Sequence, residues 1–312
     1  MKRALITGIT GFVGPYLRKE LEDHGYEVFG TSRNNNDDEK IFKWELQNRE
    51  EIRKILKEIK PDVIMHLAGQ SSVHISWQEP YNTMRTNIIG LLNLFEEVED
   101  YFPNIKLIIA SSSEIYGITN YIVKEDDIAL ESRSPYAISR VANDEFVRLI
   151  SKTRELNTTV LRLFNHTGPG QSETFVIPSF AKQLIEIKLG LKPPIVKVGN
   201  LEAQRDFSDV RDVCTAYRLM ANYNEKGGYY NVCSGKLISV RDILNLLIKM
   251  AEVKVIIEED IERIRPSDMP VLVGDYEKIN KAVRWKPTIP LEKTLNDILK
   301  YWFDVLQMKQ KK

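Results

Sequence analysis

Between an apolar run at Arg3–Thr7 and an amphipathic stretch at Phe12–Asp23, the chain reads Thr7-Gly8-Ile9-Thr10-Gly11-Phe12-Val13-Gly14. This G-x-x-G-x-x-G spacing, after a strand and at the start of a helix, is typical of turns that bind a dinucleotide. Gly8 permits the tight turn, Gly11 lets the backbone approach a pyrophosphate, and Gly14 lets the helix pack close to the sheet. The alternative is an ordinary strand–helix turn, but the context favours nucleotide binding.

The first half of the chain continues this alternation of short apolar runs and amphipathic stretches. Such units predict an α/β fold, a Rossmann-like doubly wound parallel sheet. After Asn165 the alternation becomes irregular, which indicates a smaller, interleaved C-terminal substrate lobe. We therefore expect an NADP-binding Rossmann domain over residues 1–167 and, over 168–312, mainly a substrate lobe with segments that return to the first domain.

The expected strands are Arg3–Thr7, Glu27–Thr31, Asp62–Leu67, Lys106–Ser111, Thr158–Phe164, Val196–Val198 and Tyr229–Val232. The expected helices are Phe12–Asp23, Arg49–Lys60, Thr83–Val98, Tyr136–Thr153, Ile177–Leu189, Val210–Asn222, Val240–Ala251 and Leu291–Leu306.

Composition narrows the possible partners. Lys plus Arg (44) equals Asp plus Glu (44), so no net charge favours nucleic acid. No apolar run approaches the roughly 20 residues that span a bilayer, and the N-terminal apolar stretch ends at Thr7, too early for a signal peptide. Only Cys214 and Cys233 occur, without metal-ligand spacing. We expect two buried thiols, no metal, no membrane or nucleic-acid partner, and a cytoplasmic location.

The end of the second expected strand, Thr31-Ser32-Arg33, bears on the choice of cofactor. Sites for NAD usually place an acidic residue there for the ribose 2′-hydroxyl. Arg33 instead offers a guanidinium that can bind a 2′-phosphate through two hydrogen bonds, so the sequence favours NADP. We expect Glu45 and Leu46 to lie near the adenine. The small residues of Leu67-Ala68-Gly69 should let the dinucleotide cross the sheet edge.

A serine run, Ser111-Ser112-Ser113, ends the fourth expected strand, and Ser134-Pro135-Tyr136-Ala137-Ile138-Ser139-Arg140 opens a helix. A hydroxyl and a phenol together can hold a carbonyl oxygen and exchange its proton. Tyr136 and Arg140 stand at i and i+4, on one helix face. Because a phenol has an ordinary pKa of about 10, a nearby cation is needed to bring it into the working range. This pairing predicts hydride transfer to a ketone or from an alcohol.

Two longer motifs are more specific than the glycine turn: Phe164-Asn165-His166-Thr167-Gly168-Pro169-Gly170-Gln171 and Gly199-Asn200-Leu201-Glu202-Ala203-Gln204-Arg205-Asp206-Phe207. With them, the chain resembles, over nearly its whole length, the extended short-chain dehydrogenase/reductases that act on nucleotide sugars. Within that group it resembles the GDP-4-dehydro-6-deoxy-D-mannose reductases, which make GDP-D-rhamnose. The stretches Arg263-Ile264-Arg265-Pro266-Ser267-Asp268, Gly274-Asp275 and Trp285-Lys286-Pro287 fit the same group.

The resemblance implies catalytic roles for four residues. Ser112 should hydrogen-bond the reacting sugar oxygen, Tyr136 should be the general acid, and Glu114 matches the base of the related dehydratases. At position 140 the family has lysine, which lowers the tyrosine pKa and binds the nicotinamide ribose, whereas this chain has Arg140. Arginine keeps the charge but is bulkier and cannot join a proton relay. We expect cofactor binding to be retained, and Arg140→Lys at least to preserve turnover.

The resemblance also implies a site for a GDP-linked deoxyhexose. Asn165 should offer its amide near the sugar and diphosphate, while Arg205 and Arg265 should clamp the diphosphate, because guanidinium suits phosphate oxygens. A structural ion pair is the alternative for each arginine, and Lys182 is a weaker candidate. His166 should touch the cofactor. The expected substrate residues are Ser112, Ser113, Glu114, Asn165, Lys182, Arg205 and Arg265. The family pattern further implies a homodimer through the helices at Tyr136–Thr153 and Thr83–Val98.

The expected reaction is NADPH-dependent reduction of the C4 ketone of GDP-4-dehydro-6-deoxy-D-mannose. GDP-mannose 4,6-dehydration uses overlapping residues and stays open, as does another nucleotide-sugar epimerase or reductase. A different class of protein, a catalytically silent NADP sensor, is also open. Such sensors generally lose the catalytic serine and tyrosine, and both residues are present in this chain.

Overall fold

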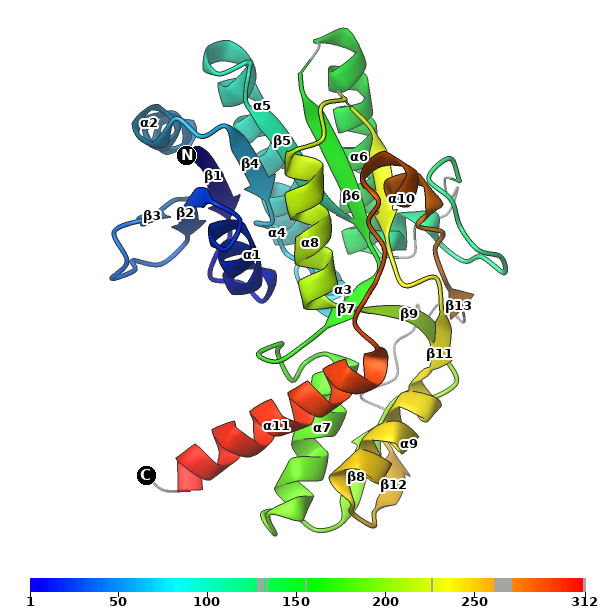
Figure 1. Ribbon diagram of the computed structural model, residues 1–312. Helices are drawn as coiled ribbons and strands as arrows, with labels where there is room; N and C mark the ends of the chain where they lie inside the picture. Colours follow the sequence, from blue (N-terminus) through cyan, green and yellow to red (C-terminus); the bar gives the residue numbers. More distant parts are fainter. Residues whose placement is uncertain (128–131, 133, 155, 226, 261–270, 311–312) are drawn as a thin grey trace.

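A computed structural model describes residues 1–127, 132, 134–154, 156–225, 227–260 and 271–310. Its centre is a seven-stranded sheet in the order β10-β6-β5-β4-β1-β2-β3, with every neighbouring pair parallel. The strands are β1 (Lys2–Thr7), β2 (Tyr26–Ser32), β3 (Ile41–Lys43), β4 (Val63–His66), β5 (Lys106–Ser112), β6 (Thr158–Leu163) and β10 (Tyr229–Val232). The predicted Rossmann-like sheet is confirmed, and it includes β10, which comes from far along the chain (Figure 1).

Helices cover both faces of this sheet. On one face, α1 (Val13–Glu22) and α8 (Val210–Ala221) pack together over side chains of the central strands. On the other face lie α2 (Arg49–Ile59), α5 (Gly90–Tyr101) and α6 (Pro135–Thr153). The spacing of the buried residues explains this packing, since apolar side chains three or four positions apart form one stripe on a helix. The stripe of α2, for example, consists of Ile52, Ile55, Leu56 and Ile59.

The helix predicted at Thr83–Val98 is longer and less regular than the sequence suggested. After the short α3 (Val73–Gln78), α4 (Pro80–Met84) begins with a proline at its first position and runs through a π-helical turn, η1 (Arg85–Ile89), into α5. Pro80 sets the start because its missing N–H is not needed there. The π turn is a local widening of the helix, a feature often found at functional sites.

The second region forms its own core. Three helices, α7 (Val176–Lys188), α9 (Val240–Ala251) and α11 (Leu291–Gln310), pack with a two-stranded parallel sheet, β8 (Ile195–Val198) and β12 (Ile256–Glu259). The remaining helix, α10 (Glu277–Val283), instead packs against β10 of the large sheet. Figure 1 shows α7, α9 and α11 below the carboxyl ends of the large sheet's strands.

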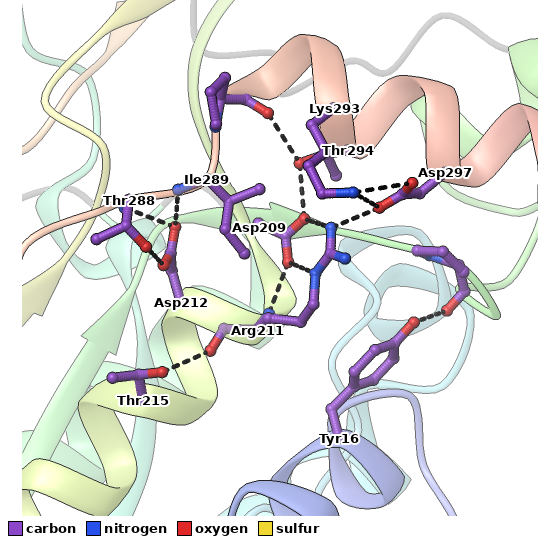
Figure 2. Close-up of polar contacts among 12 residues, drawn as sticks. Tyr16, Asp209, Arg211, Asp212, Thr215, Thr288, Ile289, Lys293, Thr294 and Asp297 are labelled. Carbon is purple, nitrogen blue, oxygen red and sulfur yellow. Dashed lines mark hydrogen bonds and ion pairs between the residues drawn. The ribbon is translucent and has the colours of Figure 1, made fainter.

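A second, four-stranded sheet lies between the two regions: β7 (Asn165–Thr167), β9 (Gln204–Asp209), β11 (Leu237–Ser239) and β13 (Val271–Leu272). A polar network beside it holds α11 to α8 (Figure 2). Asp209 accepts two hydrogen bonds from the Arg211 guanidinium (2.8 and 2.6 Å) and one from the Thr294 hydroxyl (2.7 Å). Arg211 also pairs with Asp297 at 2.8 Å. The sheet and this network fix the second region against the edge where the strands of the large sheet end.

Candidate active site

The glycine turn after β1 has the geometry that a dinucleotide requires. Gly8 has a φ of 71°, which favours glycine, and its N–H and that of Ile9 both bond to the Thr31 carbonyl (3.0 and 3.1 Å). The helix that follows, α1, has no side-chain cap at its N-terminus. Its first N–H groups therefore lack a side-chain partner, and such groups bind phosphate well.

Gly14 is required by close packing, but not against the neighbour expected from the sequence. A Cβ atom at this position would lie 2.0 Å from the Ile9 carbonyl oxygen, within the turn itself. The glycine thus lets the first turn of α1 fold back on the backbone that precedes it. Phe12, at the head of α1, stacks on the His166 ring with centroids 6.1 Å apart.

The end of β2 and the short strand β3 lie side by side. Arg33 follows Ser32 and is exposed, and the Trp44 N–H bonds to the Ser32 carbonyl at 2.9 Å. This pairing brings Glu45, which is exposed, and Leu46, which is buried, to the same edge as Arg33. These residues are predicted to surround the adenosine part of the cofactor, and β3, the strand that joins them, was not predicted.

The end of β4 bends over the glycine turn. The Ala68 N–H donates to the Thr7 hydroxyl (3.1 Å), and Thr7 lies 3.0 Å from His66 Nδ1. Burial lowers the pKa of His66 to about 3, and the nearby Arg140 charge adds to this effect. His66 is therefore neutral at physiological pH, and we assign it a structural role. Leu67, Ala68 and Gly69 continue from it along the sheet edge.

Ser112 ends β5 and Tyr136 begins α6. The Ser112 hydroxyl accepts from the Glu114 N–H (3.2 Å) and so starts a short 3₁₀ turn, η2 (Ser113–Tyr116). Ser134 caps α6 through a bond from the Ala137 N–H (3.0 Å), with Pro135 at the first helical position. Because α6 packs against both η2 and β5, the first turn of the helix lies beside the end of the strand.

Arg140 lies one turn further along α6 and is only 5% exposed. One guanidinium nitrogen donates to the Ala110 carbonyl (3.1 Å), and the guanidinium lies 5.1 Å from the centre of the Tyr136 ring. Its Nε is buried and has no hydrogen-bond partner among the described residues. The structure thus places the expected cation against the expected phenol.

A buried network behind the site holds α6 to the sheet. The Asp144 carboxylate accepts from the Ser111 hydroxyl (2.6 Å) and from Arg162 Nε (2.8 Å). Arg162 also donates to the Tyr116 hydroxyl at 3.0 Å. These contacts fix the distance between the end of β5 and the helix that carries Tyr136.

Asn87, to which no sequence motif pointed, holds the segment after β4 against α6 behind the predicted site. Its side-chain oxygen accepts from the Gln70 N–H (2.8 Å), and its nitrogen donates to the Gln70 carbonyl (3.0 Å) and the Ser139 hydroxyl (2.9 Å). The π turn η1 carries Asn87, whose own carbonyl accepts from Asn143 (3.0 Å). An asparagine inside an apolar helical stretch is the signal that could have identified it.

Strand pairing places two of the predicted substrate-binding residues, Asn165 and Arg205, on neighbouring strands. Parallel pairing of β7 with β9 sets Asn165 opposite Phe207, two residues from Arg205. His166 follows Asn165, and burial lowers its pKa. The His166 Nδ1–H donates to the Phe164 carbonyl (3.0 Å), which leaves Nε2 as an acceptor. Arg265 lies outside the described residues.

Lys182 is engaged by acidic side chains of its own lobe. Its Nζ pairs with Glu173 and lies 3.8 Å from Glu186, and it packs 5.5 Å from the centre of the Trp302 ring. These contacts favour a structural role, and substrate binding by Lys182 stays a prediction.

No helix in the described part of the chain is long and apolar enough to cross a membrane. The described residues likewise contain no cluster of three His, Cys, Asp or Glu side chains able to hold a metal ion.

Comparisons with known proteins identify the family of the chain. The family model described as GDP-mannose 4,6 dehydratase matches residues 5–298. The GDP-6-deoxy-D-mannose reductase of Pseudomonas aeruginosa is 30% identical over 96% of this chain and 97% of its own length. GDP-mannose 4,6 dehydratase 1 of Arabidopsis thaliana is 31% identical over 94% of this chain and 87% of its own. The solved structure of RMD from Pseudomonas aeruginosa, complexed with NADPH, is 30% identical, covers 98% of this chain and 100% of its own, and superposes with a TM-score of 0.87. With its parallel sheet, glycine turn and Ser112–Tyr136 pair, the chain therefore belongs to the GDP-mannose 4,6-dehydratase family of extended short-chain dehydrogenase/reductases.

Proposed function

We propose that the chain reduces the C4 ketone of GDP-4-dehydro-6-deoxy-D-mannose with NADPH, giving GDP-6-deoxy-D-mannose, or GDP-D-rhamnose. The observation that carries the proposal is that the glycine turn follows β1, Ser112 ends β5 and Tyr136 lies in the first turn of α6, which packs against β5, all at one edge of the parallel sheet. The near full-length similarity to a GDP-6-deoxy-D-mannose reductase supports the choice of substrate.

The residues present fit NADP. The uncapped start of α1 suits the pyrophosphate, and exposed Arg33 suits a 2′-phosphate. The Arg140 guanidinium, which lies beside the Tyr136 ring, offers N–H donors that suit a ribose hydroxyl. The nicotinamide supplies the hydride when NADPH is bound. Ser112 and Tyr136 hold O4 of the sugar, Tyr136 donates its proton to that oxygen, and Arg140 stabilises the tyrosinate that remains.

Asn165 and Arg205 hold the diphosphate and sugar in this proposal, which is supported by the pairing of β7 with β9, where Asn165 lies opposite Phe207, two residues from Arg205. Contacts with the remote GDP part contribute to rate by positioning C4, even though they lie away from the reacting bond. Arg265 is proposed for the same role on the strength of the family resemblance.

The test is a reductase assay with purified protein, NADPH and GDP-4-dehydro-6-deoxy-D-mannose. We expect NADPH absorbance to fall and the 6-deoxy product to form. Tyr136→Phe should lower kcat by about 100- to 10,000-fold, because it removes the general acid, while NADPH affinity is kept. Tyr121→Phe, at an exposed tyrosine, is the matched control. Tight NADPH binding without consumption of NADPH by the unmodified protein would favour a silent sensor.

The dehydratase reaction is the second candidate, because Glu114 stands two residues after Ser112 and several relatives are GDP-mannose 4,6-dehydratases. Incubation with GDP-mannose and a catalytic amount of NADP separates the two reactions. A dehydratase releases the 4-keto-6-deoxy sugar under these conditions, whereas we expect the chain to leave GDP-mannose unchanged. Accumulation of the keto sugar would make the chain a dehydratase or a bifunctional enzyme.

We also propose that the chain forms a homodimer through the outer surface of α4, η1 and α6. Large apolar side chains are exposed along these elements: Tyr81, Ile89, Ile138 and Leu149. The elements lie against one another, since α6 contacts both α4 and η1. Apolar side chains gathered on neighbouring helices are typical of protein–protein contact.

A cytoplasmic location is proposed as well. Cys214 and Cys233 are free and buried, as expected for a protein kept in reducing surroundings. Cell fractionation tests this, and recovery outside the cytoplasmic fraction would contradict it.

A further inference from the structure

The Arg140 guanidinium is a buried cation that forms no ion pair with a carboxylate in the described part of the chain. Its hydrogen-bond partner is the Ala110 carbonyl, its aromatic neighbour is Tyr136, and its Nε has no partner among the described residues. Burial lowers the pKa of His66, and the Arg140 charge adds to this effect, whereas burial raises the pKa of Asp144 and the Arg140 charge opposes that rise. Burying a charge in this way is costly, so its position must be maintained by the packing around it.

Gly69 is one part of that packing. Its backbone has no left-handed φ, so the conformation does not call for glycine. A Cβ atom at this position would lie 3.0 Å from Asn87 Oδ1 and 3.1 Å from Arg140 Nη2, closer than ordinary van der Waals contact. The absence of a side chain at Gly69 therefore makes room for these two polar groups. The next nearest described atom, Asn87 Cγ, would lie 3.8 Å from the added Cβ, which is ordinary van der Waals contact.

Asn87 is held more firmly in place than Arg140, the other neighbour of Gly69. It is 1% exposed, and it makes three hydrogen bonds, two to Gln70 and one to Ser139. Arg140 has a longer side chain held through one backbone carbonyl. An added methyl at Gly69 would therefore displace the guanidinium rather than the amide.

We propose that Gly69 is a positioning residue that seats the Arg140 guanidinium, so that Gly69 and Arg140 form one unit adapted to arginine. The atom that meets Gly69 is a fork nitrogen, and lysine has no counterpart of it, since its single nitrogen ends an unbranched stem. With lysine at position 140, the space beside Gly69 that Arg140 Nη2 fills would be empty. The methyl group of an alanine at position 69 would then fit there. This inference rests on the proposed function, in which Arg140 anchors the cofactor ribose and stabilises the tyrosinate.

The test is a double-mutant cycle of four proteins: unmodified, Gly69→Ala, Arg140→Lys, and both together. The affinity for NADPH and the kcat of the reductase reaction are measured for each. Gly69→Ala should weaken NADPH binding and lower kcat by about tenfold or more when arginine is present. In the lysine background the same change should alter either quantity by less than about threefold. Equal effects of Gly69→Ala in the two backgrounds would overturn the proposal.

Thermal unfolding of the four proteins shows which variants are folded, and this readout decides the test if a variant is unstable. Should Gly69→Ala alone fail to fold, recovery of a folded double variant would show the coupling. Failure of both would show that the methyl collides with Asn87, and the proposal would be wrong. The NADPH affinities need no sugar substrate. Absence of turnover in the unmodified protein would therefore reject the proposed reaction while the binding cycle still decides the role of Gly69.

Discussion

His66 illustrates how a residue at the site can be fixed by burial. The Thr7 hydroxyl accepts from Ala68 and lies 3.0 Å from His66 Nδ1, which suits a neutral imidazole that accepts the hydroxyl proton. Burial first, and the Arg140 charge second, lower the pKa of His66 to about 3. The unfolded chain, in contrast, binds this proton near the ordinary value of 6.5. Folding therefore competes with protonation of His66 in acid.

A change of stability with pH follows from this histidine. Its contribution is complete above about pH 6.5 and is lost as the pH falls from there toward 3, at about 1.4 kcal/mol per pH unit. Between pH 7.5 and 5, His66→Gln should lose about 2 kcal/mol less unfolding free energy than the unmodified protein. Urea denaturation at the two pH values measures this. His24→Gln, at an exposed histidine, is the control, and identical pH slopes in all three proteins would contradict the argument.

The residues of the site differed in how readily the sequence predicted them. Ser112, Tyr136 and Arg140 could be predicted because their spacing relative to a strand and a helix is itself the signal. Asn87 could not, because its hydrogen bonds join residues far apart in the chain, Gln70 and Ser139. The need for glycine at Gly69 is likewise visible only in three dimensions, since its backbone conformation is ordinary.

Among the elements, α6 connects the chemistry to the core. Its first turn carries Tyr136, and its third carries Asp144, which bonds to Ser111 of β5 and to Arg162 of β6. The Asp144 carboxylate and the Arg162 guanidinium are both buried, since each side chain is only 5% exposed. Removing one partner of a buried ion pair leaves the other as an uncompensated charge.

We therefore expect Asp144→Ala to lower the unfolding free energy by about 3–5 kcal/mol, because Arg162 stays buried without its carboxylate. Ser111→Ala, which removes one neutral donor from the same carboxylate, should cost about 1 kcal/mol. Chemical denaturation compares the two variants with the unmodified protein. A loss of 1 kcal/mol or less for Asp144→Ala would show that the ion pair does not hold α6.

The regular elements of the large sheet could be predicted from apolar periodicity, whereas its short edge strand β3 and the strands of the second sheet could not. β3 and β7 contain three residues each and β13 contains two. Runs this short carry almost no periodic signal, and their pairing partners lie at distant positions. β7 pairs with β9 across about forty residues of chain, and this pairing places Asn165 near Arg205.

At the scale of the whole molecule, the two regions share segments rather than meeting at a single linker. β10 enters the large sheet and α8 packs on α1, although both follow the first part of the substrate lobe in the chain. The network of Asp209, Arg211, Thr294 and Asp297 then ties α11 back to α8 (Figure 2). The outer surface of α4, η1 and α6 belongs to the layer of helices on the face of the large sheet opposite α1 and α8.

That outer surface carries the proposed dimer contact, and charge substitution tests it. Leu149→Glu should raise the dimer dissociation constant by about 100-fold or more, because a carboxylate would be buried against apolar side chains of the second copy. Met308→Glu, on α11, is the matched control: the two side chains are 57% and 67% exposed. Sedimentation velocity measures the assembly state. A dimer unaffected by Leu149→Glu, or dissociated by Met308→Glu instead, would place the contact on another surface.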